Sequence, residues 1–426
     1  MTKILRGRVL SFLRQPQVAD DHDSYSFIED GAILISGGTI KAVGAFADMP
    51  LGVEVIDHRP NLLMAGFIDT HNHFPQMQVI GSYGAQLLDW LNNYTFPAET
   101  KFADPVHAER MAGKYFDEML RNGTTTPVAY CSVHKTSAEA YFTEAARRNI
   151  RALGGKVLMD RNAPEGVLDT PQSAYDDTKA LIEKWHGKGR ALYAISPRFA
   201  ITSTRAQMEM AQALVAENPT CYMQTHLSEN HDEIAYTMEL YPEHPDYLGI
   251  YEHYDLLGSR ALLGHCIHLN DRERSVMADT DCVAVFCPTS NLFIGSGLFN
   301  EERTRTDGIR IAVATDIGGG TSYSMLKTMD EAYKVCQLQN QNLPPLYAFY
   351  LMTLGNAKAL GLEAKIGTLE AGSEADVVVL DAAATPAMAL RMETVTTLAE
   401  ELFVLQTLGD DRSVVETYVA GVASKP

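Results

Sequence analysis

The sequence lacks the features that mark nucleic-acid-binding, membrane-spanning and secreted proteins. Lysine and arginine form no cluster, and the formal net charge of −19 argues against nucleic acid or an anionic membrane surface as a partner. No apolar stretch approaches the length of a membrane span. The short apolar run near the start is followed at once by Arg14, so we expect no signal peptide.

Several catalytic signatures are also missing. The sequence contains neither the GxGxxG dinucleotide fingerprint nor HExxH, and the glycine-rich stretch 318–322 lacks the GK[ST] of a phosphate-binding loop. We expect that stretch to form a tight turn. The residues 231–233, His-Asp-Glu, match the HxE of cytidine deaminases, but no PCxxC follows, which excludes that zinc fold.

Cysteine is sparse, and no CxxC pair occurs. The six cysteines are Cys131, Cys221, Cys266, Cys282, Cys287 and Cys336. Most lie in apolar runs, which predicts free buried thiols in a reducing compartment. We therefore expect the protein to be cytoplasmic.

The pattern of apolar and polar residues along the chain predicts a barrel with a smaller second domain. Both ends alternate apolar and polar residues in the manner of strands, whereas the middle alternates short apolar runs with longer helical stretches. The apolar runs cover residues 62–71, 124–130, 150–159, 190–199, 221–229, 261–268, 282–290 and 309–318. Eight such repeats favour a (β/α)8 TIM-like barrel over a doubly wound sheet, the competing fold, whose fingerprint is absent.

The same pattern predicts how the chain divides into domains. We expect residues 66–365 to form the barrel, and residues 1–65 and 366–426 to form a small β-sandwich domain together. The prediction of the barrel is based on eight repeated units, whereas that of the sandwich is based on the similar strand-like pattern at the two ends. The C-terminal ends of barrel strands carry the active site in this architecture, so the residues at those ends are the candidates for chemistry.

Histidine and aspartate stand at the ends of several predicted strands. His71 and His73 end the first, and residues i and i+2 of a strand face the same way. His226 ends the fifth strand, His265 lies in the sixth, and Asp316 ends the eighth. Three or four imidazoles with one carboxylate form a ligand set for a first-row metal, with zinc or ferrous iron favoured.

Such a metal would favour hydrolysis, because it lowers the pKa of a bound water toward neutrality. A carboxylate beside that water can take its proton, and a second can pass protons to the substrate and leaving group. Asp316 suits the first role, and Glu229, three residues after His226, suits the second. Taken singly, a histidine such as His265 is more often structural than catalytic, and the role of His268 stays open.

At this point the residues carry a family resemblance. The segments GFIDTHNH, THLSEN, GHC and ATDIGGG resemble the amidohydrolase superfamily, in the branch that deaminates heterocycles. HFPQ, LLDWLNNYTFPAE, SPRFA, CPTSNLFIGSG and DIGGGTSYSML resemble the guanine deaminase family within it. The resemblance runs from about Gly66 to Leu369 and extends to both ends. The sequence differs from the family pattern at Ala65, where the family often has proline. This difference affects none of the expected metal ligands.

The resemblance implies roles for individual residues. The implied ligands of one zinc per subunit, with iron as the alternative, are His71, His73, His226 and Asp316. The resemblance further implies that His265 lies beside the metal-bound water, that Glu229 shuttles protons, and that a purine is held by three residues: Gln76, Arg198 and Phe199. It also implies a homodimer.

The implied reaction is hydrolytic deamination of guanine to xanthine and ammonia, as in purine catabolism or salvage. Guanine offers a carbonyl acceptor beside an N–H donor. Arg198 can donate to the acceptor, and Gln76 can both donate and accept. Phe199 can stack on the flat ring.

The sequence leaves three alternatives. The first is deamination of another heterocycle, such as an oxidised purine, a pterin or a triazine. The second is a two-metal hydrolase of cyclic amides. Such enzymes resemble one another in a carboxylated lysine at the end of strand four, and this chain is disfavoured as one of them because it has Ser-Pro-Arg at 196–198 and no lysine there. The third is a non-catalytic scaffold barrel. The segment 87–99 is predicted either as a lid over the pocket or as ordinary helix packing.

Overall fold

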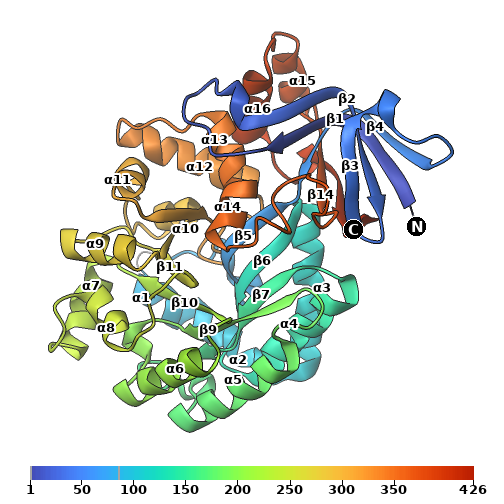
Figure 1. Ribbon diagram of the computed structural model, residues 1–426. Helices are drawn as coiled ribbons and strands as arrows, with labels where there is room; N and C mark the ends of the chain where they lie inside the picture. Colours follow the sequence, from blue (N-terminus) through green and yellow to red (C-terminus); the bar gives the residue numbers. More distant parts are fainter. Residues whose placement is uncertain (1, 85–86) are drawn as a thin grey trace.

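The central feature of the molecule is a parallel barrel (Figure 1). The computed structural model describes residues 2–84 and 87–426. Within them, the strands of the barrel pair in parallel in chain order: β5 (Phe67–His73), β6 (Thr124–Tyr130), β7 (Ala152–Gly155), β9 (Ala191–Pro197), β10 (Tyr222–Leu227), β11 (Ala261–His265), β12 (Val283–Phe286) and β13 (Arg310–Val313). The short β8 (Val157–Leu158) pairs with β9. The predicted (β/α)8 barrel is confirmed.

Hydrogen bonds outside the regular ladder close the barrel between β5 and β13. Asn356 donates through Nδ2 to the carbonyl oxygens of Ile68 (2.7 Å) and Val313 (2.9 Å). The backbone N–H of Asp316 donates to the carbonyl oxygen of His71 at 2.9 Å. The first and last strands are thereby held together near the start of β5 and, through Asp316 and His71, at the end where the predicted metal ligands lie.

Apolar side chains fill the interior of the barrel. Alternate residues of the strands meet there in one buried cluster that includes Ile68, Val128, Leu153, Ala194, Leu262, Val283 and Ala312. Side chains of an eight-stranded barrel are just large enough to fill it. The interior is therefore a packed core, which leaves the rim as the place for a substrate.

Helices surround the barrel on the outside (Figure 1). They are α3 (Pro105–Arg121), α4 (Lys135–Arg148), α5 (Pro171–Trp185), α6 (Arg205–Glu217), α7 (His231–Leu240), α8 (Tyr247–His253), α9 (Asp271–Asp279), α10 (Pro288–Phe293), α11 (Glu301–Thr306), α12 (Met325–Leu338), α13 (Pro345–Tyr350) and α14 (Asn356–Ala359). The sequence explains α3 well: Asp104 caps its first turn by accepting from Val106 N–H, and Pro105 needs no partner at the first position. No helix among the described residues is long and apolar enough to cross a membrane.

The two ends of the chain form a second sheet. In the described part of the chain its order is β16 (Val422–Ala423), β15 (Val414–Val419), β14 (Val377–Leu380), β4 (Glu54–Ala65), β1 (Thr2–Phe12), β2 (Tyr25–Ser36) and β3 (Thr39–Ala45). The N-terminal β4 pairs antiparallel with the C-terminal β14, so Met64 lies opposite Val378. Gly37 and Gly38, both with positive φ, form the tight turn between β2 and β3. The helices α15 (Pro386–Met392) and α16 (Leu398–Leu408) lie between β14 and β15 in the chain.

The boundaries of some predicted strands differ from the structure. The predicted strand 62–71 is divided, because residues 62–65 end β4 in the terminal sheet and β5 begins at Phe67. The run 282–290 ends as a strand at Phe286, because Pro288 begins α10. β13 ends at Val313, so Asp316 lies in the loop that follows. The division of the chain into domains at residues 65 and 365 stays a prediction.

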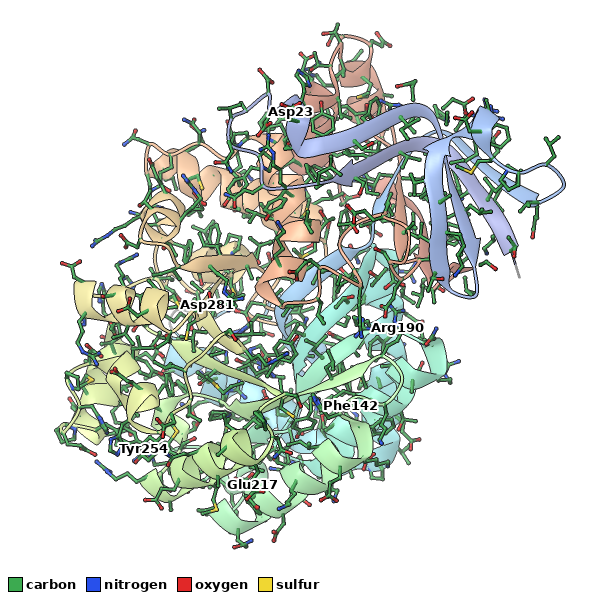
Figure 2. All side chains as sticks on the ribbon, viewed as in Figure 1. Asp23, Phe142, Arg190, Glu217, Tyr254 and Asp281 are labelled. Atoms are coloured by element: carbon green, nitrogen blue, oxygen red, sulfur yellow. The ribbon has the colours of Figure 1, made fainter. Side chains whose placement is uncertain are left out.

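A buried ion-pair network joins the barrel to the terminal sheet. Arg190, which precedes β9 and is labelled in Figure 2, donates to Glu374 (Nε to Oε2, 2.9 Å) and to Asp376 (Nη1 to Oδ1, 3.1 Å). Arg151 donates to the same Glu374 oxygen at 2.8 Å. Arg190 and Asp376 are only 10% and 4% exposed at their side chains. Charges this well buried depend on each other, because neither can be hydrated if its partner is lost.

Arg190→Met should therefore lower the free energy of unfolding by about 3 kcal/mol, because it leaves Asp376 buried without this partner. Chemical denaturation followed by circular dichroism measures the change. Arg412→Met is the matched control, since Arg412 pairs with Asp410 at the surface and is 62% exposed at its side chain. It should shift stability by less than about 0.5 kcal/mol. Equal losses in both variants would contradict a special role for the network.

Candidate metal centre and active site

Four of the predicted metal ligands meet at one end of the barrel. His71 and His73 project from the end of β5, and His226 projects from β10 across the mouth. The Nε2 atoms of His73 and His226 are 3.2 Å apart. Asp316 Oδ1 is 3.4 Å from the Nε2 atoms of both His71 and His73. Each of these side chains is buried.

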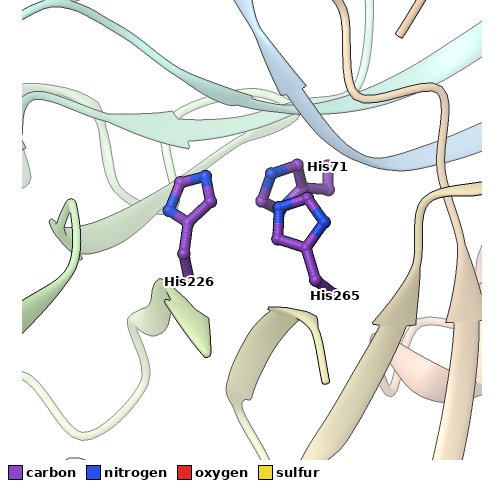
Figure 3. A group of neighbouring side chains, drawn as sticks. All are labelled: His71, His226 and His265. Atoms are coloured by element: carbon purple, nitrogen blue, oxygen red, sulfur yellow. The ribbon is translucent and has the colours of Figure 1, made fainter. Parts of the chain in front are cut away.

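The fifth predicted residue, His265, lies on the next strand. Figure 3 shows the rings of His71, His226 and His265 gathered in one space at the ends of three strands. One ligand atom of each lies within 4.8 Å of the others. The Nε2 atom of His265 is 3.9 Å from Asp316 Oδ2 and 3.4 Å from Glu229 Oε2. Its ring therefore stands between the ligand group and the second predicted carboxylate.

Backbone strain accompanies this convergence. His265 (φ 72°) and Asp316 (φ 51°) both adopt the left-handed conformation, which side chains other than glycine rarely occupy. Each such residue costs about 1 kcal/mol or more, and such strain gathers where function demands a fixed geometry. Here it accompanies two side chains at the mouth, one at the last residue of β11 and one just beyond β13.

The outer nitrogen of two imidazoles is engaged by the protein. His226 donates from Nδ1 to the carbonyl oxygen of Arg198 at 2.7 Å. His265 Nδ1 lies 2.9 Å from Asn291 Oδ1, an acceptor. A neutral imidazole that donates from Nδ1 carries its lone pair on Nε2, the atom that faces the cluster in both residues. Metal-binding histidines are commonly oriented in this way.

The cluster fits a divalent metal. His71 Nε2 is buried and has no hydrogen-bond partner, although a buried polar atom without one is costly. A metal ion would satisfy it, as well as the two imidazole nitrogens of His73 and His226 that face each other. Three imidazoles with one carboxylate suit zinc and related first-row ions. Cys287 also lies within reach of His265 and Asp316, but burial raises the pKa of its thiol well above the usual value and keeps it protonated.

The surroundings favour the protonation states that metal ligands need. Burial lowers the pKa of His71 to about 4, and it lowers the pKa values of His73 and His226 as well, so these rings are neutral near pH 7. Burial alone would raise the pKa of Asp316, but the neighbouring rings of His71 and His73 hold it well below its usual value. Neutral imidazoles beside an ionised carboxylate are the ligand forms that bind metal.

Glu229 differs from Asp316 in its surroundings. Burial raises the pKa of Glu229, partly offset by the neighbouring His265. Ser296 donates to Glu229 Oε1 at 2.8 Å, and Glu233 Oε2 accepts from the backbone N–H of Glu229 at 2.8 Å. Two carboxylates whose pKa values are pushed apart can serve as base and acid in one reaction.

The three predicted purine-binding residues line the same pocket. Its lining includes Gln76, Arg198 and Phe199 together with His73, His226, Glu229, His265 and Asp316. Arg198 donates from Nη1 to both oxygens of Glu99, at 2.8 and 2.9 Å. Gln76 donates from Nε2 to Glu99 Oε1 at 2.9 Å. The structure therefore gathers the predicted site residues at one pocket, with His71 just beneath its lining, beside Asp316.

The segment after β5 forms one wall of this pocket. Leu87, Trp90 and Leu91 line it, from α1 (Leu87–Trp90) and the π-helical turn Leu91–Thr95 that leads into α2 (Phe96–Thr100). Trp90 donates from Nε1 to the carbonyl oxygen of Ser82 at 3.2 Å. The segment is therefore part of the pocket as well as packed helix, and its action as a lid stays a prediction.

Four supporting residues were missed by sequence reasoning. Asp69 accepts from Thr315 N (3.0 Å) and Oγ1 (2.5 Å), and burial raises its pKa to about 7. The others are Asn291, Ser296 and Glu99, each in contact with a predicted site residue. All four lie inside the motifs GFIDTHNH, CPTSNLFIGSG and LLDWLNNYTFPAE. Their motifs could have drawn attention to them, but only the fold shows what each side chain contacts.

Comparisons with known proteins agree with this geometry. The amidohydrolase family model matches residues 62–423. Guanine deaminase of Escherichia coli (strain K12) is 46% identical over 98% of this chain and 97% of that protein. The solved structure of E. coli guanine deaminase aligns with a TM-score of 0.96 at 45% identity, covering 99% of each chain. Guanine deaminase from C. acetobutylicum with bound guanine aligns with a TM-score of 0.89 at 29% identity, covering 99% of this chain and 100% of that one. The chain belongs to the amidohydrolase family and, within it, to the guanine deaminases.

Proposed function

We propose that the protein catalyses the hydrolytic deamination of guanine to xanthine and ammonia, a step in purine breakdown or salvage. The observation that carries this proposal is one pocket that borders the cluster of buried histidines with Asp316 and is lined also by Glu229, Gln76 and Arg198. The family membership and the 46% identity to a guanine deaminase over nearly the whole chain support it.

We propose that one zinc ion per chain, with iron as the alternative, is held by four residues: His71, His73, His226 and Asp316. The orphaned nitrogen of His71 and the facing nitrogens of His73 and His226 support this assignment. When bound, such a metal supplies a water of lowered pKa that can attack carbon at neutral pH.

The carboxylates would move the protons of the reaction. Asp316 Oδ2, which faces His265, would take up a proton from the attacking water and return it to the departing ammonia. Glu229 would protonate the ring nitrogen beside the attacked carbon, for which its raised pKa suits it, and would take back a proton from the new hydroxyl group as the carbonyl of xanthine forms. His265 stands between the two carboxylates, whose charges raise its pKa against the effect of burial. It would stabilise negative charge that develops there.

The opposite side of the pocket would recognise the base. The guanidinium of Arg198 would donate to the carbonyl oxygen of guanine, and the amide of Gln76 would bind the neighbouring donor and acceptor. Phe199, 4% exposed, would stack on or border the ring. A purine without the matching edge would leave buried polar groups unpaired, which is the strongest form of discrimination available to such a site.

We also propose that the protein works in the cytoplasm as a homodimer. The six cysteines are free and buried in the structure, as expected for a reducing compartment. Size-exclusion chromatography with light scattering would measure the mass, and a monomer mass would contradict the dimer.

The decisive experiment measures ammonia release by the metal-loaded protein. Guanine, adenine, an oxidised purine, a pterin and a triazine would be supplied in parallel, with the metal content determined by elemental analysis. The proposal predicts the highest kcat/KM for guanine. A higher kcat/KM for another heterocycle would identify that compound as the substrate in place of guanine. If none of the compounds released ammonia, the result would favour a non-catalytic scaffold barrel.

Glu229→Gln should lower kcat by about 100- to 10,000-fold, because the amide cannot shuttle a proton, while the metal content stays unchanged. Steady-state kinetics and elemental analysis measure the two effects. Asp232→Gln provides a control on the exposed face of α7 and should retain activity. If Glu229→Gln lost the metal, Glu229 would be a ligand and its assignment as a proton carrier would be wrong.

Asp316→Asn should weaken metal affinity by more than roughly 100-fold, because it removes a charged ligand. Loss of a residue that only hydrogen-bonds to a ligand typically costs about 10- to 100-fold. Metal retained after dialysis against a chelator measures this effect. Asp246→Asn changes a buried carboxylate that pairs with Arg272, away from the pocket, and should keep the metal. Full retention in Asp316→Asn would exclude Asp316 as a ligand.

A further inference from the structure

Glu99 is a buried carboxylate that lies behind the base-recognition side of the pocket. It ends the segment LLDWLNNYTFPAE in α2, and only 1% of its surface is exposed. It does not line the pocket itself. Its two oxygens accept hydrogen bonds from Arg198 and Gln76, the two side chains proposed to read the purine. One carboxylate thus holds both recognition groups.

Glu99 determines which way the amide of Gln76 points. Gln76 Nε2 donates to Glu99 Oε1 at 2.9 Å, and Gln76 Oε1 accepts from the backbone N–H of Gly318 at 3.3 Å. A carboxylate can only accept and a backbone N–H can only donate, so the reversed amide would lose both bonds. The amide keeps one N–H and one oxygen lone pair for a ligand, in a single arrangement.

Glu99 also neutralises the charge of Arg198. The guanidinium stays protonated in proteins, and here its side chain is 3% exposed, so water cannot screen it well. The central guanidinium carbon of Arg198 lies 5.5 Å from the centre of the ring of Phe96, which is on the same helix as Glu99. Without Glu99 the pocket would gain an uncompensated buried positive charge, and such a charge acts strongly over short distances.

We propose that Glu99 is a positioning residue for base recognition, which fixes the amide of Gln76 and neutralises Arg198 so that the pocket selects a neutral purine over an anionic one. This inference rests on the proposed function. Guanine is neutral near pH 7, whereas its deamination product, xanthine, loses a proton more readily. A neutral recognition side therefore favours entry of the substrate and departure of the product.

A purely structural ion pair would behave differently from a positioning residue. Loss of a structural pair would lower stability and weaken the binding of every purine by a similar factor. Loss of Glu99 as we propose it would reverse a preference, because the unpaired Arg198 attracts an anion. The ratio of affinities for an anionic and a neutral purine therefore separates the two roles.

The first test compares the kinetics of Glu99→Gln and Glu99→Asp with those of the original protein. In Glu99→Gln the KM for guanine should rise by about 10- to 100-fold while kcat changes by less than about threefold, because recognition is lost and proton transfer is not. Glu99→Asp keeps the charge and should show a smaller rise in KM. An unchanged KM in Glu99→Gln would overturn the inference.

The second test measures ligand affinity by isothermal titration calorimetry on metal-loaded protein at pH 7. Urate is the anionic probe and hypoxanthine the neutral one. In Glu99→Gln the Kd ratio should shift toward urate by at least about tenfold, whereas Glu99→Asp should keep the original ratio. Asp169→Asn is the matched control, because Asp169 is a buried carboxylate beside Lys156 outside the pocket, and it should leave the ratio unchanged.

The outcomes distinguish the failures of the two proposals. If the original protein does not deaminate guanine, the proposed function fails, whatever the ligand ratio shows. If it does, and if Glu99→Gln weakens urate and hypoxanthine equally, Glu99 is structural and the inference is overturned. Thermal unfolding and metal content of each variant are measured first. If Glu99→Gln does not fold, Glu99→Asp and Arg198→Met are compared instead. Arg198→Met should weaken the binding of urate more than that of hypoxanthine. An unchanged ratio of the two Kd values would overturn the inference.

Discussion

Closure of the barrel between β5 and β13 is the constraint on which the site depends. His71 and His73 stand at the end of the first strand and Asp316 just beyond the last, so the contact between these strands sets their spacing. The backbone bond from Asp316 to His71 and the bonds from Thr315 to Asp69 hold that junction. Because side chains fill the interior below, the polar residues at the closure can converge only at the rim.

A buried group of imidazoles and carboxylates is stable only if a second layer of residues supports it. The carbonyl of Arg198 orients His226, Asn291 orients His265, and Ser296 holds Glu229. Each contact also selects a tautomer or a rotamer, so the layer that keeps the site folded also prepares its chemistry. Glu99 extends the same principle to the side proposed to bind the purine, where it accepts hydrogen bonds from both Gln76 and Arg198.

Much of the fold and of the ligand group could be predicted because both leave local marks in the sequence. The paired histidines His71 and His73 share a face of a strand through their spacing of two, and apolar runs alternating with helical stretches indicate the barrel. The boundaries were less accurate, since the run 62–71 reads as one strand although its first part belongs to the terminal sheet. Only the pairing of β4 with β14, distant in sequence, divides it.

The sequence by itself determined the fold class, the residue types of the candidate metal site and the family, because strand periodicity and short motifs are local properties. Only the tertiary structure decided which side chains support the site. Glu99 lies 99 residues from Arg198 in the chain, and Ser296 lies 67 residues from Glu229. No local sequence pattern indicates either contact. Hydrogen-bond partners depend on how strands and helices pack, and packing brings together residues that no local pattern connects.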